Sequence, residues 1–259
     1  MMKKWLAIIT FSVLLLIPVG FLEAFAINSL RITTEDAGGN IDSITIADNS
    51  IMDSEPLIDG LIFSILNGFG CADISITATM TKPEIGSSVF PVMDLLFDSA
   101  SSEECHIDIE FSDTGFVTSG NIAITSVIDG ETSGNVQYKV FFDPANGIFE
   151  QTNLLFDTGI LSPTNPPLNL DFSGNGQGGV SNSGDYSITM LVTLWHSNVQ
   201  GQTSAEATLV GEDTAIGGTL LPIDSFALLV AGVQSTTWMI PVLASIVGIG
   251  LFLLRRDRN

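Results

Sequence analysis

The chain has 259 residues, 45% of them hydrophobic, and its mean hydropathy of +0.42 is high for a protein of this size. It carries 29 acidic and 8 basic residues, a formal net charge of −21. This excess of negative charge excludes nucleic-acid binding, which needs cations to displace the counterions of phosphates. Two cysteines and two histidines are too few for a zinc ribbon, an iron–sulfur cluster or a c-type haem site.

The first 26 residues have the organisation of a secretory signal peptide. Lys3 and Lys4 provide a positive start, and an apolar run over residues 5–21 follows. Ala24 and Ala26 then give the small-x-small pattern that a signal peptidase cuts. We therefore predict cleavage after Ala26, with an uncleaved membrane anchor as the alternative.

Turn-forming residues and alternating polarity organise residues 27–212. Apolar and polar side chains alternate in segment after segment, which is typical of strands with one buried and one solvated face. We expect about ten to twelve strands in an all-β, antiparallel, jelly-roll-like β-sandwich. The alternating segments are 29–33, 42–47, 73–79, 106–112, 121–125, 134–142, 185–195 and 203–210. The turns predicted between strands are Gly38-Gly39-Asn40, Asp59-Gly60, Asn67-Gly68, Asp129-Gly130, 143–147 and Gly174-Asn175-Gly176.

A linker over residues 213–236 and a membrane-spanning helix over residues 237–254 are predicted after this domain. Residues 238–254 carry no charge, and the basic tail 255–259 follows them. A spanning helix needs about 17–25 apolar residues, and arginines next to it stay in the cytoplasm. The chain is therefore expected to be a single-pass membrane protein of the cell surface with its domain outside. A buried C-terminal helix of a soluble domain is the alternative.

The part between the two apolar ends is strongly acidic. Residues 27–236 contain only Arg31, Lys82 and Lys139 as cations, against 27 acidic residues, a net charge of −24. The acids are scattered singly along the chain rather than gathered in runs. Such a composition suits solubility outside a cell, and it also suits calcium binding.

One glycine-rich segment is a candidate calcium site. Residues 173–185 and their surroundings offer oxygens from Asp171, Asn175 and Asp185. The order of acids differs from that of an EF-hand or a nonapeptide calcium repeat. A flexible hairpin loop is therefore the main interpretation, and calcium held by these three residues is the alternative. We predict no other cofactor.

The two cysteines, Cys71 and Cys105, are expected to form a disulfide. A single pair in an exported domain is usually oxidised, and closing this loop is worth about 3–4 kcal/mol on the chain-entropy model. A reactive thiol beside His106 is the alternative. Neighbouring residues of a strand point to opposite faces, so Cys105 and His106 are poorly placed to act as a dyad.

The sequence contains no recognisable catalytic constellation. A Gly-x-Ser-x-Gly elbow is absent, and neither His106 nor His196 has a serine motif near it. Both histidines are interpreted as surface or hydrogen-bonded side chains rather than metal ligands. Acidic pairs are expected by chance among so many acids. The predicted protein is therefore not an enzyme. In the body, only Trp195, Tyr138 and Tyr186 are expected to be able to build a sugar-stacking platform.

The C-terminal segment resembles a known class of sorting signal. Leu221, Pro222, Ile223 and Asp224, the apolar span, and Arg255 and Arg256 form a tripartite arrangement. It is similar to the signals handled by exosortases and archaeosortases, and most similar to the C-termini of archaeal cell-surface proteins. Leu221-Pro222-Ile223-Asp224 stands where the bacterial signals have Pro-Glu-Pro. Residues 111–116 and 142–146 also resemble the β-rich surface domains that carry such signals.

These observations predict a non-catalytic cell-surface protein with a structural or adhesive role. The resemblance implies a sorting transpeptidase as a partner, with a cut near Leu221–Asp224. The expected partners are also the membrane, other envelope proteins and surface glycans, but no nucleic acid. The alternative function is a surface carbohydrate-binding module or a glycan-active hydrolase. Exposed aromatic side chains beside two close carboxylates on one sheet face would favour that alternative.

Overall fold

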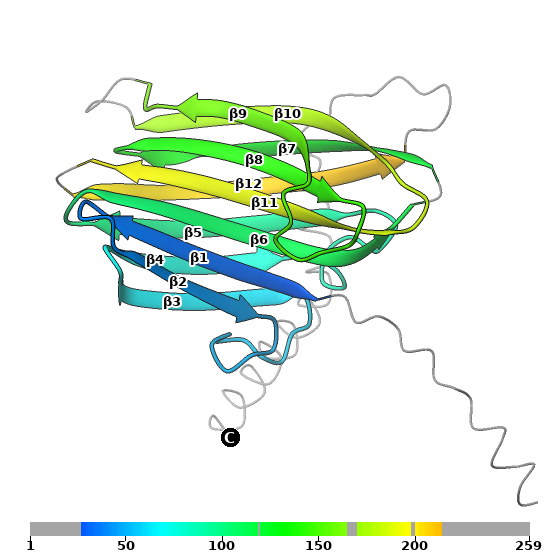
Figure 1. Cartoon of the computed structure of the whole chain (residues 1–259), viewed down its shortest axis with the longest axis horizontal. Helices are drawn as coiled ribbons and strands as arrows, with labels where there is room; N and C mark the ends of the chain where they lie inside the picture. The colour runs from blue at the N-terminus through cyan, green and yellow to red at the C-terminus, as the bar shows by residue number, and fades with distance from the viewer. Residues whose placement is uncertain (1–26, 119, 165–169, 198–199, 214–259) are drawn as a thin grey trace, which may run out of the picture. The chain divides into compact units, whose positions relative to one another are not determined.

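The computed structural model describes residues 27–118, 120–164, 170–197 and 200–213, and these residues form a sandwich of two antiparallel sheets (Figure 1). Sheet A consists, in spatial order, of β2 (Ile41–Ala47), β1 (Asn28–Asp36), β6 (Cys105–Val117), β11 (Asp185–His196), β8 (Asn135–Asp143) and β9 (Asn153–Leu161). Sheet B consists of β10 (Asp171–Ser181), β7 (Asn121–Thr132), β12 (Gly201–Asp213), β5 (Val92–Ser101), β4 (Ala72–Met80) and β3 (Leu61–Phe69).

The strand order is that of a jelly roll with two added hairpins. Of the last eight strands, β5, β7, β10 and β12 lie in sheet B and β6, β8, β9 and β11 lie in sheet A. Strand β12 lies between β5 and β7, and β11 lies between β6 and β8, as in an eight-stranded jelly roll. Hairpin β1–β2 extends sheet A beside β6, and hairpin β3–β4 extends sheet B beside β5. The prediction of an all-β antiparallel sandwich is thus confirmed for the described residues.

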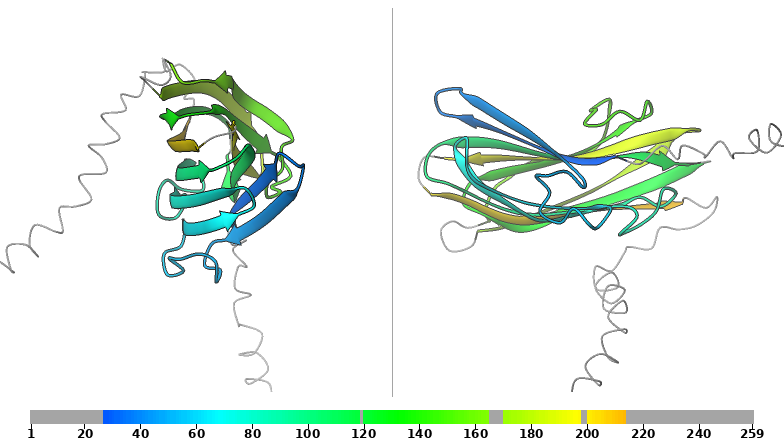
Figure 2. Two further views of the ribbon diagram at one scale, coloured as in Figure 1. Left: turned by 90° about the vertical axis from the view of Figure 1, so that its left-hand side faces the viewer. Right: turned by 90° about the horizontal axis from the view of Figure 1, so that it is seen from below.

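The core lies between the sheets and follows from the two-residue period of the strands. On β11, for example, Ile188, Met190, Val192 and Leu194 are all fully buried and face sheet B. Phe97 of β5 faces them from sheet B and is fully buried too. The predicted alternation therefore places the apolar residues inside, as expected. Figure 2 shows the two sheets stacked face to face.

Each end of the sandwich has its own set of connections. The turns β1–β2, β3–β4, β5–β6 and β7–β8 lie at one end, called here the disulfide end, on the left of Figure 1. The other end, called the terminal end, holds Ile27 and Asp213, where the described chain begins and stops. The register places Asp213 beside Ile122, at the start of β7.

Three predicted turns are wrong, because glycine in them permits close packing or a bulge rather than a chain reversal. Asp129-Gly130 lies inside β7, where a Cβ on Gly130 would collide with the backbone of β12. Asn67-Gly68 lies inside β3, at a register shift between Leu66 and Phe69, with Gly68 at φ +62°.

The third wrong turn, Gly174-Asn175-Gly176, lies inside strand β10, so the predicted flexible hairpin loop over residues 173–185 is wrong too. Strand β10 pairs with β7 along its whole length. Its three central inward positions are Gly174, Gly176 and Gly178, and a Cβ on Gly176 would strike the ring of Phe156 on β9. The missing side chains let the edge strands β9 and β10 of the two sheets pack against each other.

Several predictions concern residues outside the described part of the chain. The signal peptide with Ala24 and Ala26, the sorting residues 221–224, the span 237–254 and the basic tail 255–259 all lie there. Within the part that the structure does describe, no helix is long and apolar enough to cross a membrane.

Candidate functional site

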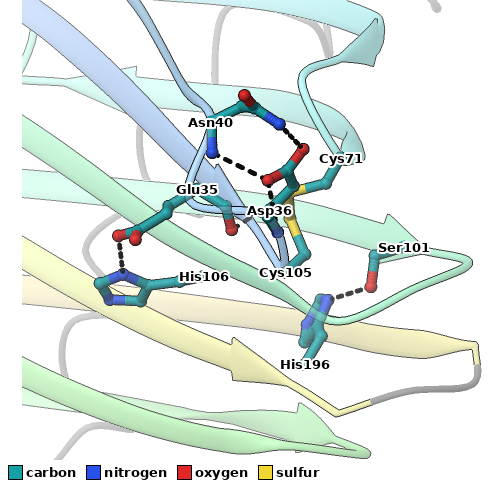
Figure 3. The surroundings of a disulfide bond; sticks show 9 residues. Glu35, Asp36, Asn40, Cys71, Ser101, Cys105, His106 and His196 are labelled. Atoms are coloured by element: carbon teal, nitrogen blue, oxygen red, sulfur yellow. Dashed lines mark hydrogen bonds and ion pairs between the residues drawn. A yellow bond between two sulfur atoms is a disulfide. The ribbon is translucent and has the colours of Figure 1, made fainter.

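The disulfide between Cys71 and Cys105 is confirmed, and it joins the two sheets (Figure 3). Cys71 lies in the turn between β3 and β4 of sheet B, and Cys105 is the first residue of β6 in sheet A. Their Cα atoms are 5.7 Å apart, which is an ordinary spacing for a disulfide. A thiol nucleophile beside His106 is excluded by this bond.

His196 lies on the inner side of the disulfide end and is satisfied by two hydroxyl groups. Its Nδ1 is 3.0 Å from Ser101 Oγ, and its Nε2 is 2.9 Å from Thr203 Oγ1. The side chain is almost fully buried, and burial lowers the pKa of His196 below its usual value. The interpretation of His196 as a hydrogen-bonded side chain is therefore confirmed.

A row of four polar and aromatic residues crosses the outer face of sheet A at the disulfide end. Glu35 of β1 is in register with His106 of β6, His106 with Trp195 of β11, and Trp195 with Asn135 of β8. We call these four residues the Trp195 row. The rings of His106 and Trp195 stack with an interplanar angle of 13° and a centroid distance of 5.5 Å. Alternation along the strands, which buries Leu194 and His196, turns Trp195 outward.

Two carboxylates flank His106 from two strands. Nδ1 of His106 is 3.9 Å from Glu35 Oε2, and Nε2 is 3.7 Å from Asp108 Oδ1. Thr193 Oγ1 donates a hydrogen bond of 2.7 Å to Asp108 Oδ1, which fixes this carboxylate on the sheet. The imidazole is thus held between two acids and against the ring of Trp195 (Figure 3 shows the contact with Glu35).

The Trp195 row lines an open concavity of about 600 Å³. The β1–β2 turn forms one wall and is stiff, because Asp36 accepts hydrogen bonds from the Asn40 side chain and backbone and from the Gly38 N–H. The Asn40 side chain, with the backbone bonds, lowers the pKa of Asp36. Glu104 adds a further carboxylate to the lining.

The chemistry of this concavity is that of an aromatic surface surrounded by hydrogen-bond acceptors. A tryptophan ring offers a large flat apolar area with a polar N–H. Carboxylates accept hydrogen bonds from hydroxyl groups, and the Asn135 amide can both accept and donate them. Aromatic area combined with a few placed polar groups is the usual composition of a binding site for a small organic ligand.

The two tyrosines expected to share a platform with Trp195 do not do so, and this prediction is wrong. Tyr138 and Tyr186 are fully buried between the sheets. The Tyr138 hydroxyl is 2.7 Å from Ser126 Oγ of sheet B, and burial raises the pKa of Tyr138. Burial also raises the pKa of Tyr186 to about 12. Both positions have the parity of their buried neighbours on β8 and β11, a signal that the sequence did contain.

The three calcium candidates are not brought together. Asp171 and Asn175 both lie on β10, four residues or about 13 Å apart along the strand. Asp185 begins β11 in the other sheet, near the far end of β10. Among the described residues there is no group of three histidine, cysteine or acidic side chains that could hold a metal ion.

A second cluster, which the sequence did not predict, lies inside the terminal end. Lys82, in the loop after β4, places its Nζ 2.6 Å from Asp113 Oδ2 of β6. The two side chains come from different sheets and are separated by 31 residues. Only the register of the sheets brings them together, so no local pattern could have found them.

No family model matches this sequence, and no curated protein matches it. Among the solved structures to which this chain is similar, three share 9–10% sequence identity with it. TmCBM61 in complex with beta-1,4-galactotriose has a TM-score of 0.27 and covers 58% of this chain and 88% of its own. The mannan-recognising carbohydrate-binding module TmCBM27 also has a TM-score of 0.27 and covers 54% and 89%. A carbohydrate-binding module of the β-sandwich superfamily has a TM-score of 0.25 and covers 71% and 70%.

Proposed function

We propose that this protein is a non-catalytic adhesive protein of the cell surface, which binds a glycan at the Trp195 row. The observation that carries the proposal is the outward ring of Trp195, stacked on His106 and set between carboxylates in an open concavity. A sugar ring stacks its C–H face on such a ring, while its hydroxyl groups donate to Glu35 and Asp108.

The topology of the domain supports an outward-facing site. The predicted span 237–254 and tail 255–259 would hold the protein at the membrane through the linker that begins after Asp213. Asp213 ends β12 at the terminal end, whereas the Trp195 row lies at the disulfide end. A tether attached at the terminal end leaves the opposite end free to meet other cells, envelope proteins or surface glycans. A sorting transpeptidase acting near Leu221–Asp224 would change the anchor but not this orientation.

The charges around the site favour neutral or amino sugars over acidic ones. Glu35, Asp36, Glu104 and Asp108 surround the concavity or lie beside His106, and none of the described lysine or arginine residues lines it. A uronic acid or a sulfated sugar would meet repulsion from these carboxylates. An amino sugar would be attracted both by them and by the face of Trp195.

Binding to a panel of immobilised glycans by the full-length protein in detergent tests this proposal. We expect neutral or amino-sugar glycans to bind and Trp195→Ala to weaken binding by about fivefold or more, since an aromatic contact is worth roughly 1 kcal/mol or more. Phe90→Ala is the matched control, because Phe90 is a half-exposed aromatic at the terminal end.

Two results would count against the proposal. Equal binding by Trp195→Ala and the parent protein would remove the Trp195 row as the site. Release of new reducing ends from any bound glycan would favour the alternative of a hydrolase, because two carboxylates do flank His106 on this face.

A further inference from the structure

The contacts of Lys82 are complete and all internal. Its Nζ lies 2.6 Å from Asp113 Oδ2, 2.6 Å from the carbonyl oxygen of Thr114, and 3.7 Å from the centre of the Phe116 ring. The Lys82 side chain is 8% exposed, and the Asp113 side chain is not exposed at all. An amine and a carboxyl group are therefore in contact in a space closed to water by an aromatic ring.

The chain on both sides of the pair is held in place. The Thr81 N–H donates to the carbonyl of Gly60 at 2.8 Å, and the Ile85 N–H donates to the carbonyl of Thr81 at 3.0 Å. Gly60 adopts φ +85°, and a Cβ there would collide with the carbonyls of Thr81 and Lys82. Lys82 is thus presented to Asp113 by a loop with little freedom to move.

Burial acts on both partners in the direction of their neutral forms. Removal from water lowers the pKa of Lys82, although Asp113 opposes this effect. Removal from water also raises the pKa of Asp113, although Lys82 opposes it. In water an ammonium and a carboxylate are favoured over the amide they could form, because both ions are well hydrated. Burial removes that hydration, which is the main reason why the ions are stable.

We propose that Lys82 and Asp113 condense to form an intramolecular isopeptide bond between Nζ and Cγ, with the loss of one water molecule. The link joins the loop after β4 in sheet B to β6 in sheet A. The proposal depends on no ligand and is independent of the glycan site.

The reaction is balanced within the cluster. The ammonium first transfers a proton to Asp113 Oδ2 across the 2.6 Å contact, which leaves a neutral amine and a carboxylic acid. The Nζ lone pair then attacks Cγ, and the N–C bond forms while the bond from Cγ to Oδ2 breaks. Oδ2 leaves as water, with the proton already transferred and a second proton from Nζ. Oδ1 becomes the oxygen of the amide.

Neighbouring groups of the same chain are placed for each step. The Thr114 N–H donates to Oδ1 at 2.7 Å, where negative charge builds up during the attack. The Thr81 hydroxyl donates to Oδ2, the leaving oxygen, at 2.6 Å, and is positioned to relay the second proton to it. The Thr114 carbonyl accepts a hydrogen bond from Nζ and so orients the amine.

The position of the bond gives it a mechanical role. The disulfide already fixes the start of β4 to the start of β6 at the disulfide end. An amide between Lys82 and Asp113 fixes the other end of β4 to the same strand. Pulling forces between tether and ligand would then act on a sandwich whose two sheets are covalently joined at both ends.

Peptide mapping of the full-length protein tests the proposal directly. After reduction and alkylation, cleavage after glutamate releases residues 36–84, which contain Lys82 because the Glu55–Pro56 bond is not cut, and residues 111–131, which contain Asp113. We expect these two peptides to appear as one branched species, lighter than their sum by one water, with fragment ions that place the link at Lys82 and Asp113. Two separate peptides from the folded parent protein would overturn the proposal.

Two variants serve as controls. Lys82→Arg keeps a cation beside Asp113 but has no nucleophilic amine, so it should fold and give separate peptides. A branched species in Lys82→Arg would place the link elsewhere and overturn the assignment. Thr81→Val keeps the shape of Thr81 and removes its hydroxyl, so the branched fraction at a fixed time after synthesis should fall. An unchanged fraction would overturn the relay by Thr81.

Discussion

The two ends of the sandwich connect the same two strands with opposite chemistry. At the disulfide end, Cys71 and Cys105 join β4 to β6 through a bond that needs oxidation but is indifferent to charge. At the terminal end, Lys82 and Asp113 join them through groups whose contact depends on the exclusion of water. The comparison shows that a specific link between the sheets holds each end of the sandwich together, where turns interrupt the hydrogen-bonded pairing of the strands.

The ends also respond to pH in opposite directions. Burial lowers the pKa of His196 at the disulfide end, so unfolding takes up a proton in acid and stability falls as the pH drops below the usual histidine value. Burial raises the pKa of Asp94, near the terminal end of β5, so unfolding releases a proton and stability falls as the pH rises.

Removing the Lys82 side chain at the terminal end should have the largest effect. Lys82→Met is expected to lower the free energy of unfolding by at least about 3–5 kcal/mol, because Asp113 stays buried without its partner and the proposed amide cannot form. Chemical denaturation measures this loss. Lys139→Met is the matched control, since Lys139 is 3.9 Å from Asp157 on an outer face and its side chain is 29% exposed. The control should change stability by less than about 1 kcal/mol. Equal effects of the two changes would contradict the distinction.

Removing the link at the disulfide end should have a slightly smaller effect. The double change Cys71→Ser and Cys105→Ser is expected to cost about 3–4 kcal/mol, because the unfolded chain regains the freedom of a long loop. The same loss should follow when the parent protein is reduced before denaturation. Free-thiol labelling of the denatured, unreduced parent should find no reactive thiol, and two labelled thiols would contradict the disulfide.

The pH response of the terminal end should be smaller again and should depend on Asp94. Burial, with a further contribution from Glu206, raises the pKa of Asp94 from 3.8 to about 7. Asp94→Asn should therefore leave stability unchanged near pH 4 and raise it above pH 7. Solvent reaches part of this carboxylate, so we expect about 2 kcal/mol rather than the full value of the shift.

Denaturation curves between pH 4 and pH 8 measure the effect of Asp94→Asn. Asp98→Asn, at an exposed position of the same strand, makes the same change of charge and should shift stability by less than about 0.5 kcal/mol. A parallel gain in both variants would mean that total charge, rather than burial of Asp94, sets the response.

The smallest change in stability is expected at the Trp195 row. Trp195→Ala removes an outer-face ring and its stack on His106, which should cost about 1 kcal/mol or less. Thermal melts at matched concentration measure it. A loss as large as that of the disulfide variant would show that the ring serves the fold, and its effect on glycan binding could not then be assigned to the site.

The sequence predicted the sandwich because alternation is a local property. Segments such as 106–112 and 185–195 alternate between apolar and polar residues, and both lie in strands, β6 and β11, where expected. Strand β10 was missed because its three central inward positions are glycines, so apolar residues mark the inward face only near its two ends, at Phe172 and Val180. Glycine at Gly130 was misread for a related reason, since close approach to another strand and chain reversal both require it.

The candidate sites also differ in whether a local feature of the sequence predicts them. The disulfide followed from a count of two cysteines, and parity along β11 is a local signal from which the outward position of Trp195 could have been predicted. The stack of Trp195 on His106, and the pairing of Lys82 with Asp113, depend on the register between strands far apart in the chain. That register is set by the pairing of distant strands and cannot be predicted from any local pattern in the sequence.

The bulges of β3 have a consequence for crowding at a surface. Strand β3 is an edge of sheet B, and its pairing with β4 shifts register twice, between Ile62 and Ser64 and between Leu66 and Phe69. An exposed regular edge is a template for pairing with the edge of a neighbouring molecule, and bulges interrupt its row of donors and acceptors. Many copies packed densely side by side can therefore remain separate molecules instead of fusing their sheets into a continuous fibre.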